Sequence, residues 1–320
     1  MGHNGAMNDY LILGAGAVGS VVGGRLGLAG QRVQLINRSA ETAKAIAAQG
    51  GLRLGLDDGD VLAPVLAATP DQAQAARHVL LLTKTPQSEA AVRAVAPLMG
   101  PDTVWITLQN GLGNGQRLAQ WLGDAARVVH GVTMLPADLR APGDVASHGK
   151  STTWLGPLQA RDAACSDAVA RDLAAAGIDA HHVLGVQNNI WQKAVFNCAM
   201  NGLCALTQGG PGLMADWPDG RALAHELVDE VGAVALAAGA QVDLEAVHAL
   251  VDMGMAHHRY HKPSMLQDVL AQRLTEIDAL NGFVHEQAQR LGLAAPKNHM
   301  ILRLVRLRER APEFWAAQTH

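Results

Sequence analysis

The chain of 320 residues has 49% hydrophobic and 17% charged residues, which excludes a disordered protein and provides enough apolar surface for two domains. Its formal net charge of −4 and its scattered basic residues exclude an extended basic surface, so we expect no nucleic-acid or membrane partner. Three cysteines without a Cys-x-x-Cys pair, no signal-type N-terminus and no apolar run of about 20 residues predict a cytoplasmic protein.

The first half of the chain alternates short apolar runs with helical patterns, from Tyr10 to about Val186. This alternation is typical of strand-helix-strand units and a parallel sheet. Ser39 is expected to cap a helix that ends near Gly50. We predict strands at 10–14, 32–37, 78–83 and 103–108, a hairpin within 51–69, further antiparallel strands at 128–135, 143–149 and 152–156, and a final helix at 164–176 followed by a strand at 179–184.

After Val186 the periodicity changes to 3.6 residues and no convincing strand remains. The sequence therefore predicts two domains, an α/β domain at 1–186 with a Rossmann-type doubly wound sheet and an all-helical domain at 187–320. In the first predicted helix of the second domain, Lys193, Asn197 and Asn201 recur every four residues and share one face. They are either a thin solvent stripe or a buried set that needs partners.

A glycine-rich loop follows the first predicted strand. Gly14 permits the tight turn, Gly16 lets the backbone approach a pyrophosphate, and Gly19 allows close packing of helix on strand. The start of the following helix supplies N–H groups and a positive dipole. We expect a dinucleotide here, the alternative being a structural glycine turn. The residues expected at the cofactor are Gly14, Ala15, Gly16, Ala17, Val18 and Gly19.

The end of the second strand indicates which dinucleotide binds. An acidic residue at this place would bond the ribose 2′-hydroxyl of NAD, but the chain reads Ile36-Asn37-Arg38-Ser39. A guanidinium suits a 2′-phosphate. We therefore predict NADP(H), with Asn37 and Arg38 at the cofactor, against the alternative that Arg38 is an ordinary surface residue.

Two polar loops leave neighbouring buried strands, TKTPQ with Lys84 and Gln87, and TLQNGLGN with Gln109 and Asn110. Because carboxyl ends of parallel strands meet at one sheet edge, where ligands bind in doubly wound folds, we expect these loops at the ligand. The alternative is a pair of ordinary polar loops.

Residues 262–282 carry two predicted helix starts. Ser264 is expected to cap one helix, with Gln267 completing a capping box. Thr275 is expected to start the next, with Glu276 in its first turn. Before this stretch, His257 and His261 have the spacing of a helical zinc site, but His258 stands where the glutamate of a His-Glu-x-x-His motif would be, so no metal is expected.

With GAGAVG, TKTPQ, LQNGLGN, WQKAVFNCAMN and SMLQD…TEIDALNG in this order, the chain resembles the ketopantoate reductase family over nearly its whole length. The last two motifs are specific to that family, whereas the glycine loop is not. The resemblance implies an N-terminal Rossmann domain, a C-terminal helical domain, and NADPH-dependent reduction of 2-dehydropantoate to (R)-pantoate in coenzyme A biosynthesis.

The resemblance also implies residue roles. Lys193 matches the lysine that protonates the carbonyl oxygen, Glu276 a carboxylate that contacts substrate and cofactor, and Asn110 a residue that touches both ligands. An ammonium close to a carbonyl that becomes negative can stabilise it and supply a proton. The remaining matches are substrate contacts at Asn197, Asn201 and Ser264, and cofactor contacts at Lys84 and Gln87.

The chain departs from the family's usual pattern at Gly202, Pro211 and His261, and at 271–274, where AQRL replaces the common Gly-Arg. They leave a different small 2-oxo acid open as the substrate. A third reading is a non-catalytic NADP(H)-binding sensor, against which the intact Lys193 and Glu276 count. The apolar faces of the helical domain either pair two subunits in a homodimer or form its own core.

Overall fold

The computed structural model describes residues 7–316 and separates the chain into two compact units. The sheet unit contains the chain up to Gln109 and Asn114–Val186. The helical unit contains Asn110–Gly113 and the chain from Gln187 onward. A four-residue loop between two elements of the sheet unit therefore belongs to the helical unit.

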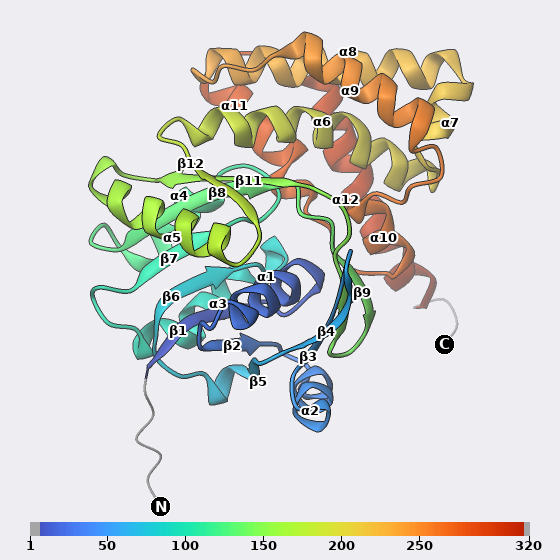
Figure 1. Cartoon of the computed structure of the whole chain (residues 1–320). Helices are drawn as coiled ribbons and strands as arrows, with labels where there is room; N and C mark the ends of the chain where they lie inside the picture. The colour runs from blue at the N-terminus through green and yellow to red at the C-terminus, as the bar shows by residue number, and fades with distance from the viewer. Residues whose placement is uncertain (1–6, 317–320) are drawn as a thin grey trace, which may run out of the picture. The chain divides into compact units, whose positions relative to one another are not determined.

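The sheet unit is built on a sheet with the strand order β12-β11-β8-β7-β6-β1-β2-β5 (Figure 1). All neighbouring strands are parallel except β8 and β11. The strands are β1 (Asn8–Leu13), β2 (Val33–Ile36), β5 (Leu66–Ala68), β6 (Ala76–Leu81), β7 (Val104–Thr107), β8 (Arg127–Thr133), β11 (Thr152–Pro157) and β12 (Asp179–His182).

Both faces of this sheet are covered by helices. The helices are α1 (Ala17–Leu28), α2 (Ala40–Gln49), α3 (Ser88–Val95), α4 (Asn114–Leu122) and α5 (Ala163–Ala175), with single 3₁₀ turns η1 (Pro70–Gln72), η2 (Thr85–Gln87), η3 (Ala96–Leu98) and η4 (Ala160–Asp162). Tyr10 and Ile12 pack in the core with α1 and α5, whereas Leu11 and Leu13 pack in the core with α3 and α4. Alternate residues of β1 thus enter opposite cores, as expected for a strand covered on both sides.

A second, smaller sheet has the order β4-β3-β10-β9, with β3 (Leu52–Leu56), β4 (Gly59–Ala63), β9 (Asp138–Ala141) and β10 (Asp144–Ala146). The predicted hairpin is confirmed, because β3 and β4 are antiparallel around Asp58. Its expected end is different, since residues 66–68 form β5 of the larger sheet. The predicted antiparallel pairing of the later strands is partly right, because β8 is also parallel to β7.

The helical unit contains no strand among its described residues (Figure 1). Its elements are α6 (Val186–Thr207, which starts one residue earlier, in the sheet unit), α7 (Pro211–Asp216), α8 (Pro218–Ala237), α9 (Leu244–His257), α10 (Ser264–Leu270), η5 (Ile277–Ala279), α11 (Asn281–Arg290) and α12 (Pro296–Ala316). The predicted fold class is confirmed. Among residues 7–316, no helix combines the length and the apolar character that crossing a bilayer requires.

Helix α6 is buried along most of its length. Trp191, Ala194 and Cys198 are buried on one side of the helix, and Met200 is buried on the opposite side. At Gly202 the helix packs so closely on α12 that a Cβ atom would overlap Cγ2 of Ile301. A buried helix with small residues at its contacts gives its polar side chains a fixed position.

A helix does begin at Ser264, but its predicted cap is wrong, and so is the predicted helix start at Thr275. Ser264 is the first residue of α10 rather than its cap, and the Gln267 amide donates to the carbonyl oxygen of Lys262 at 2.8 Å instead of closing a capping box. Thr275 and Glu276 precede the single turn η5, and α11 begins only at Asn281. The Thr275 hydroxyl accepts from the N–H of Ile277 at 3.2 Å, which favours a short turn over a continuous helix.

Candidate active site

The helical unit brings together the loop 110–113, helix α6 and the segment 275–281. The backbone N–H of Leu112 donates to the carbonyl oxygen of Ala279 at 2.7 Å. Gly111 has a φ of +96°, and a Cβ atom there would lie 2.6 Å from the same oxygen, so only glycine fits. The loop is thus held against the segment that carries Glu276.

Lys193 lies at the meeting point of these three segments. Its ammonium donates to the side-chain oxygen of Asn110 with an Nζ–Oδ1 distance of 2.8 Å. Burial lowers the pKa of Lys193 to about 8, and the carboxylate of Glu276 opposes this shift. Glu276 is itself only 8% exposed. The structure therefore joins the three residues to which the resemblance gives the central roles.

Asn197 and Asn201 follow Lys193 along the same face of α6 and are 9% and 6% exposed. Neither side-chain amide makes a hydrogen bond to any residue that the structure describes. Buried amides are normally paired, so these two side chains are a buried set that needs partners and not a solvent-exposed stripe. Ser264 is half-buried on α10, and no described contact joins it to Lys193.

In the sheet unit the glycine loop has two kinds of glycine. Gly14 has a φ of +102°, and a Cβ there would lie 2.5 Å from the backbone N of Thr83, while a Cβ at Gly19 would overlap the carbonyl oxygen of Gly14. Glycine is therefore required at both positions by packing within the protein. Gly16 is exposed, has a φ of −79°, and a Cβ there would meet nothing within 4 Å. Its open side leaves room for a cofactor pyrophosphate at the uncapped start of α1.

Asn37 and Arg38 have different positions at the end of β2. The Asn37 amide donates to the carbonyl oxygen of Ala15 at 3.2 Å, and its oxygen accepts from the N–H of Ser39 at 3.1 Å. Its side chain therefore holds the glycine loop. Arg38 is exposed and makes no hydrogen bond or ion pair with the described residues. Ala15 is buried, whereas Ala17 and Val18 are half-buried at the start of α1.

The two polar loops of the sheet unit do converge, as predicted. The Gln109 amide donates to the carbonyl oxygen of Thr83 and to Oγ of Ser88, the second at 2.7 Å. The Gln109 side chain therefore stabilises the turn that begins after Thr83. Lys84 and Gln87 are half-buried in the turn it holds, where the Gln87 N–H donates to the Lys84 carbonyl oxygen at 2.9 Å.

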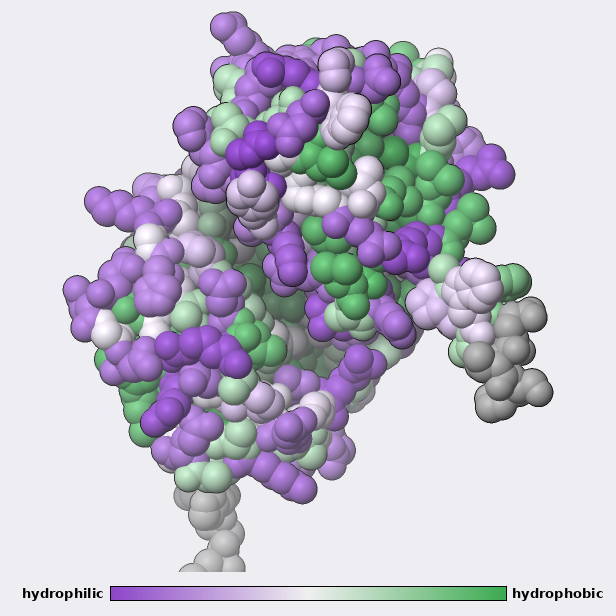
Figure 2. All heavy atoms as spheres, turned by 90° about the vertical axis from the view of Figure 1, so that its right-hand side faces the viewer, coloured by the Kyte–Doolittle hydropathy of each residue, from purple (hydrophilic) through white to green (hydrophobic). Residues whose placement is uncertain are grey.

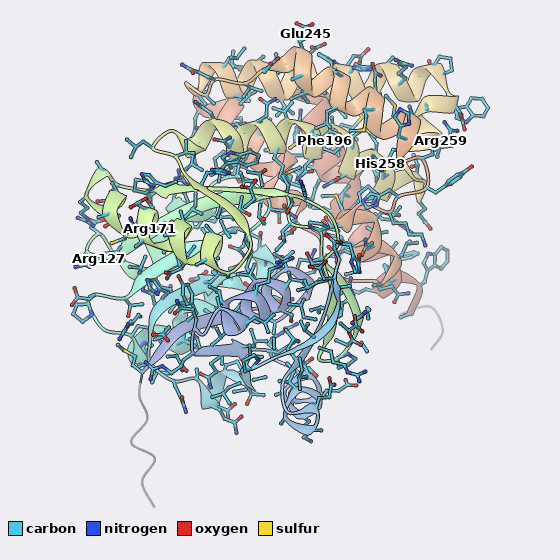
Figure 3. All side chains as sticks on the ribbon, viewed as in Figure 1. Arg127, Arg171, Phe196, Glu245, His258 and Arg259 are labelled. Carbon is cyan, nitrogen blue, oxygen red and sulfur yellow. The ribbon has the colours of Figure 1, made fainter. Side chains whose placement is uncertain are left out.

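The spacing of His257 and His261 does not produce a helical metal site. Helix α9 ends at His257, so His261 lies outside it. Figure 3 shows His258 and Arg259 just beyond this end, where Arg259 donates to Asp216 at 2.7 Å. Among residues 7–316 no group of three or more His, Cys, Asp or Glu side chains is placed to hold a metal ion.

Asn281 is a buried polar residue to which the sequence reasoning gave no role. It is fully buried, and its amide donates to the carbonyl oxygen of Cys198 at 3.1 Å. In the sequence, an asparagine followed by glycine at the start of a helical pattern could have indicated a buried polar residue. The same pattern is also typical of an ordinary helix cap.

Comparison of the sequence with known families gives two adjacent matches. Residues 10–160 match the family described as Ketopantoate reductase PanE/ApbA, and residues 185–309 match the family described as Ketopantoate reductase PanE/ApbA C terminal. The chain is 30% identical over 302 residues to a 2-dehydropantoate 2-reductase of Pyrococcus horikoshii, covering 93% of this chain and 96% of that protein. It is 29% identical to one of Streptococcus pyogenes serotype M6, covering 93% and 97%.

Solved structures give a similar result. A PanE/ApbA family ketopantoate reductase from Ralstonia eutropha JMP134 superposes with a TM-score of 0.85 and 30% identity, covering 98% of this chain and all of that one. D-mandelate dehydrogenase, solved as a ternary structure with NADH and anilino(oxo)acetate, superposes with a TM-score of 0.87 and 27% identity, covering 94% and 99%.

Proposed function

The chain belongs to the ketopantoate reductase family, and we propose that it reduces 2-dehydropantoate to (R)-pantoate with NADPH. As a member it is an oxidoreductase that acts on CH–OH groups and uses a nicotinamide cofactor. One observation carries the proposal: the Lys193 ammonium, with its pKa lowered to about 8, is bonded to Asn110.

Lys193 is the proposed general acid. When bound, the reduced nicotinamide supplies a hydride to the carbonyl carbon of the substrate. The Lys193 ammonium stabilises the negative charge that develops on the carbonyl oxygen and transfers a proton to it. A lysine pKa of about 8 favours this transfer near neutral pH more than the ordinary value of 10.5. Glu276 keeps Lys193 protonated by opposing the effect of burial.

The buried amides of Asn197 and Asn201 are the proposed substrate contacts, with Ser264 as a third. Their N–H and O–H groups can donate to the carboxylate and hydroxyl oxygens of a small 2-oxo acid. Asn110 orients the Lys193 ammonium by accepting a hydrogen bond from one of its three N–H groups. The substrate oxygen then takes the proton of another of these groups.

For the cofactor we propose NADP(H). The open backbone side of Gly16 suits a pyrophosphate, and the exposed guanidinium of Arg38 suits a 2′-phosphate. Asn37 is proposed to support cofactor binding by stabilising the glycine loop through its hydrogen bond to the carbonyl oxygen of Ala15. The other proposed cofactor contacts are Lys84, Gln87, Asn110 and Glu276.

A second candidate keeps the reaction and changes the substrate to another small 2-oxo acid. The similarity to D-mandelate dehydrogenase, solved with anilino(oxo)acetate, favours it, as do the departures at Pro211 and His261. That structure also contains NADH, so the alternative cofactor is NAD(H).

Turnover assays distinguish these candidates. The purified protein is mixed with NADPH or NADH and each of a panel of 2-oxo acids that includes 2-dehydropantoate, and loss of the reduced cofactor is followed by absorbance. The proposal predicts the largest kcat/KM for NADPH with 2-dehydropantoate. A larger value for another 2-oxo acid supports the second candidate, and no turnover on any acid contradicts both.

A homodimer is also proposed, through α12. Met300, Leu304, Leu307 and Phe314 recur at four, three and seven residues and are 43–66% exposed, so they form one apolar face. On the face of the helical unit that Figure 2 shows, hydrophobic residues gather together. Light scattering coupled to size exclusion tests the dimer, and the monomer mass at micromolar concentration contradicts it.

A further inference from the structure

A chain of buried polar groups crosses the helical unit. The Asn281 amide donates to the carbonyl oxygen of Cys198 at 3.1 Å and to the side-chain oxygen of Asn298 at 2.8 Å. The Asn298 amide donates to Oε1 of Glu230, also at 2.8 Å. Asn281 and Asn298 are both fully buried. The chain therefore connects α6, α11, α12 and α8 through two fully buried asparagines and the half-buried carboxylate of Glu230.

The far end of this chain is anchored firmly. The two carboxylate oxygens of Glu230 accept from the backbone N–H groups of Lys297 and Asn298, at 3.1 and 2.7 Å. A carboxylate at the start of a helix is stabilised by the helix dipole and satisfies N–H groups that have no partner within the helix. Helix α12 thus holds Asn298, and Asn298 holds Asn281.

The near end of the chain reaches the proposed active site. Asn281 is the first residue of α11 and lies five positions after Glu276, separated only by the turn η5 and Leu280. Cys198 follows Asn197 on α6, the helix that also carries Lys193. The hydrogen bond between Asn281 and Cys198 therefore ties the segment that carries the carboxylate to the helix that carries the ammonium.

Gly202 lies one turn after Cys198 and allows α12 to approach α6 beside this bond. A Cβ atom at Gly202 would lie 4.0 Å from the Asn281 side-chain oxygen and would overlap Cγ2 of Ile301. The close approach of α12 to α6 at this glycine leaves Asn281 packed between them. A polar side chain enclosed in this way has one available position, which is what a positioning residue requires.

We propose that Asn281 is a positioning residue that fixes the placement of Glu276 relative to Lys193. The inference rests on the proposed role of Lys193 as the acid. Among the charged groups of residues 7–316, Glu276 is the one whose carboxylate acts on the pKa of Lys193. If Glu276 moves away, its opposition to the effect of burial weakens and the pKa of Lys193 falls. The alkaline limit of activity then moves to lower pH.

The test compares Asn281→Ala with Asn298→Ala, using the 2-oxo acid that the wild-type protein reduces fastest. Asn281→Ala removes the bond to Cys198, whereas Asn298→Ala breaks the same buried chain one link further away and leaves that bond intact. Both variants are expected to lower the Tm. Asn281→Ala is expected to lower kcat by about tenfold and to move the alkaline limb of the kcat profile down by about 0.5 to 1 pH unit. Asn298→Ala leaves the bond to Cys198 in place, so smaller changes in the same directions are expected.

Equal pH profiles for Asn281→Ala and the wild type, with only the Tm lowered, overturn the inference and leave the proposed function standing. The same holds if Asn298→Ala moves the profile as far as Asn281→Ala does. If Asn281→Ala does not fold, Asn281→Ser, which keeps a short donor, is measured in its place, with a smaller shift in the same direction expected. No turnover by the wild-type protein overturns the proposed function and this inference together.

Discussion

Lys193 and Asn110 are 83 positions apart in the chain and are joined by a hydrogen bond of 2.8 Å between Nζ and Oδ1. The bond provides an acceptor for one N–H group of the ammonium, whose pKa is lowered by burial. It also fixes the direction of the remaining two protons, because the Asn110 loop is held to Ala279 by the Leu112 N–H. An acid that is oriented and has a lowered pKa is suited to transferring a proton to a ligand.

Removing the proposed acid tests this directly. We expect Lys193→Ala to lower kcat by about 10²-fold to 10⁴-fold, because a positioned general acid contributes about that much, with a smaller change in KM. Steady-state kinetics with NADPH and the best 2-oxo acid give both values. Lys150→Ala, which removes an exposed lysine in the sheet unit, is the matched control. A variant at Lys193 with wild-type kcat would exclude the assigned role.

The pH dependence follows from the pKa of Lys193. The proposed acid acts as its ammonium, so kcat is expected to fall as pH rises through about 8. Glu276→Gln removes the carboxylate that opposes the effect of burial, so the pKa of Lys193 falls further and the limb moves to lower pH. Glu245→Gln removes an exposed carboxylate on α9, which Figure 3 labels, and should leave the limb in place. The expectation would be contradicted if the alkaline limb of the kcat profile moved to higher pH in Glu276→Gln.

The pKa of Lys193 also affects stability. Between about 8 and the ordinary value of 10.5, the unfolded chain binds more protons at Lys193 than the folded chain. The contribution of this residue to the free energy of unfolding is therefore expected to rise with pH across that window. Denaturant unfolding of the wild type and Lys193→Met at pH 7.5 and 10 measures it, and the stability of Lys193→Met relative to wild type should be greater at pH 7.5 than at pH 10.

Two glycines of the cofactor loop should respond differently to alanine. Gly16→Ala adds a Cβ into open space at an ordinary φ, so the Tm should change little while NADPH binding weakens by about tenfold or more. Gly14→Ala places a Cβ at φ +102° against the backbone of Thr83, so the Tm should fall. Fluorescence titration with NADPH and thermal unfolding provide the two measurements. Unchanged NADPH affinity in Gly16→Ala would place the pyrophosphate elsewhere.

Arg38 is expected to set the choice of cofactor. Arg38→Ala removes an exposed guanidinium without a described partner, so the Tm should be unchanged and the ratio of kcat/KM for NADPH over NADH should fall by about tenfold. Arg53→Ala, another exposed arginine of the sheet unit, is the control. An unchanged ratio would mean that Arg38 is an ordinary surface residue.

The sequence allowed the fold to be predicted where local signals are strong. The Ser39 hydroxyl does accept from a backbone N–H, that of Glu41, at the start of α2, and Gly50 ends this helix with a φ of +75°. The buried strands β6 and β7 were recognisable as continuous apolar runs. The cytoplasmic location and the site roles stay predictions, because neither follows from these elements.

What the sequence could not show depends on contacts between distant residues. The start of α11 at Asn281 instead of Thr275 reflects a local turn and a bond to α6 that no periodicity reveals. The cofactor contact of Asn37 stays a prediction, and the sequence did not reveal that its side chain also bonds to Ala15 and Ser39. Only the three-dimensional contacts distinguish a side chain that touches a ligand from one that holds the loop beside it.

The loop 110–113 makes the helical unit discontinuous in sequence. A fragment that begins at Gln187 would contain Lys193 and Glu276 but lack Asn110, so its ammonium would lose the partner described above. Recombination between two relatives at this boundary would pair the loop of one parent with the Ala279 surface of the other. Asn110, Gly111 and Ala279 are therefore expected to work only when exchanged as one set, although 168 positions separate Gly111 from Ala279.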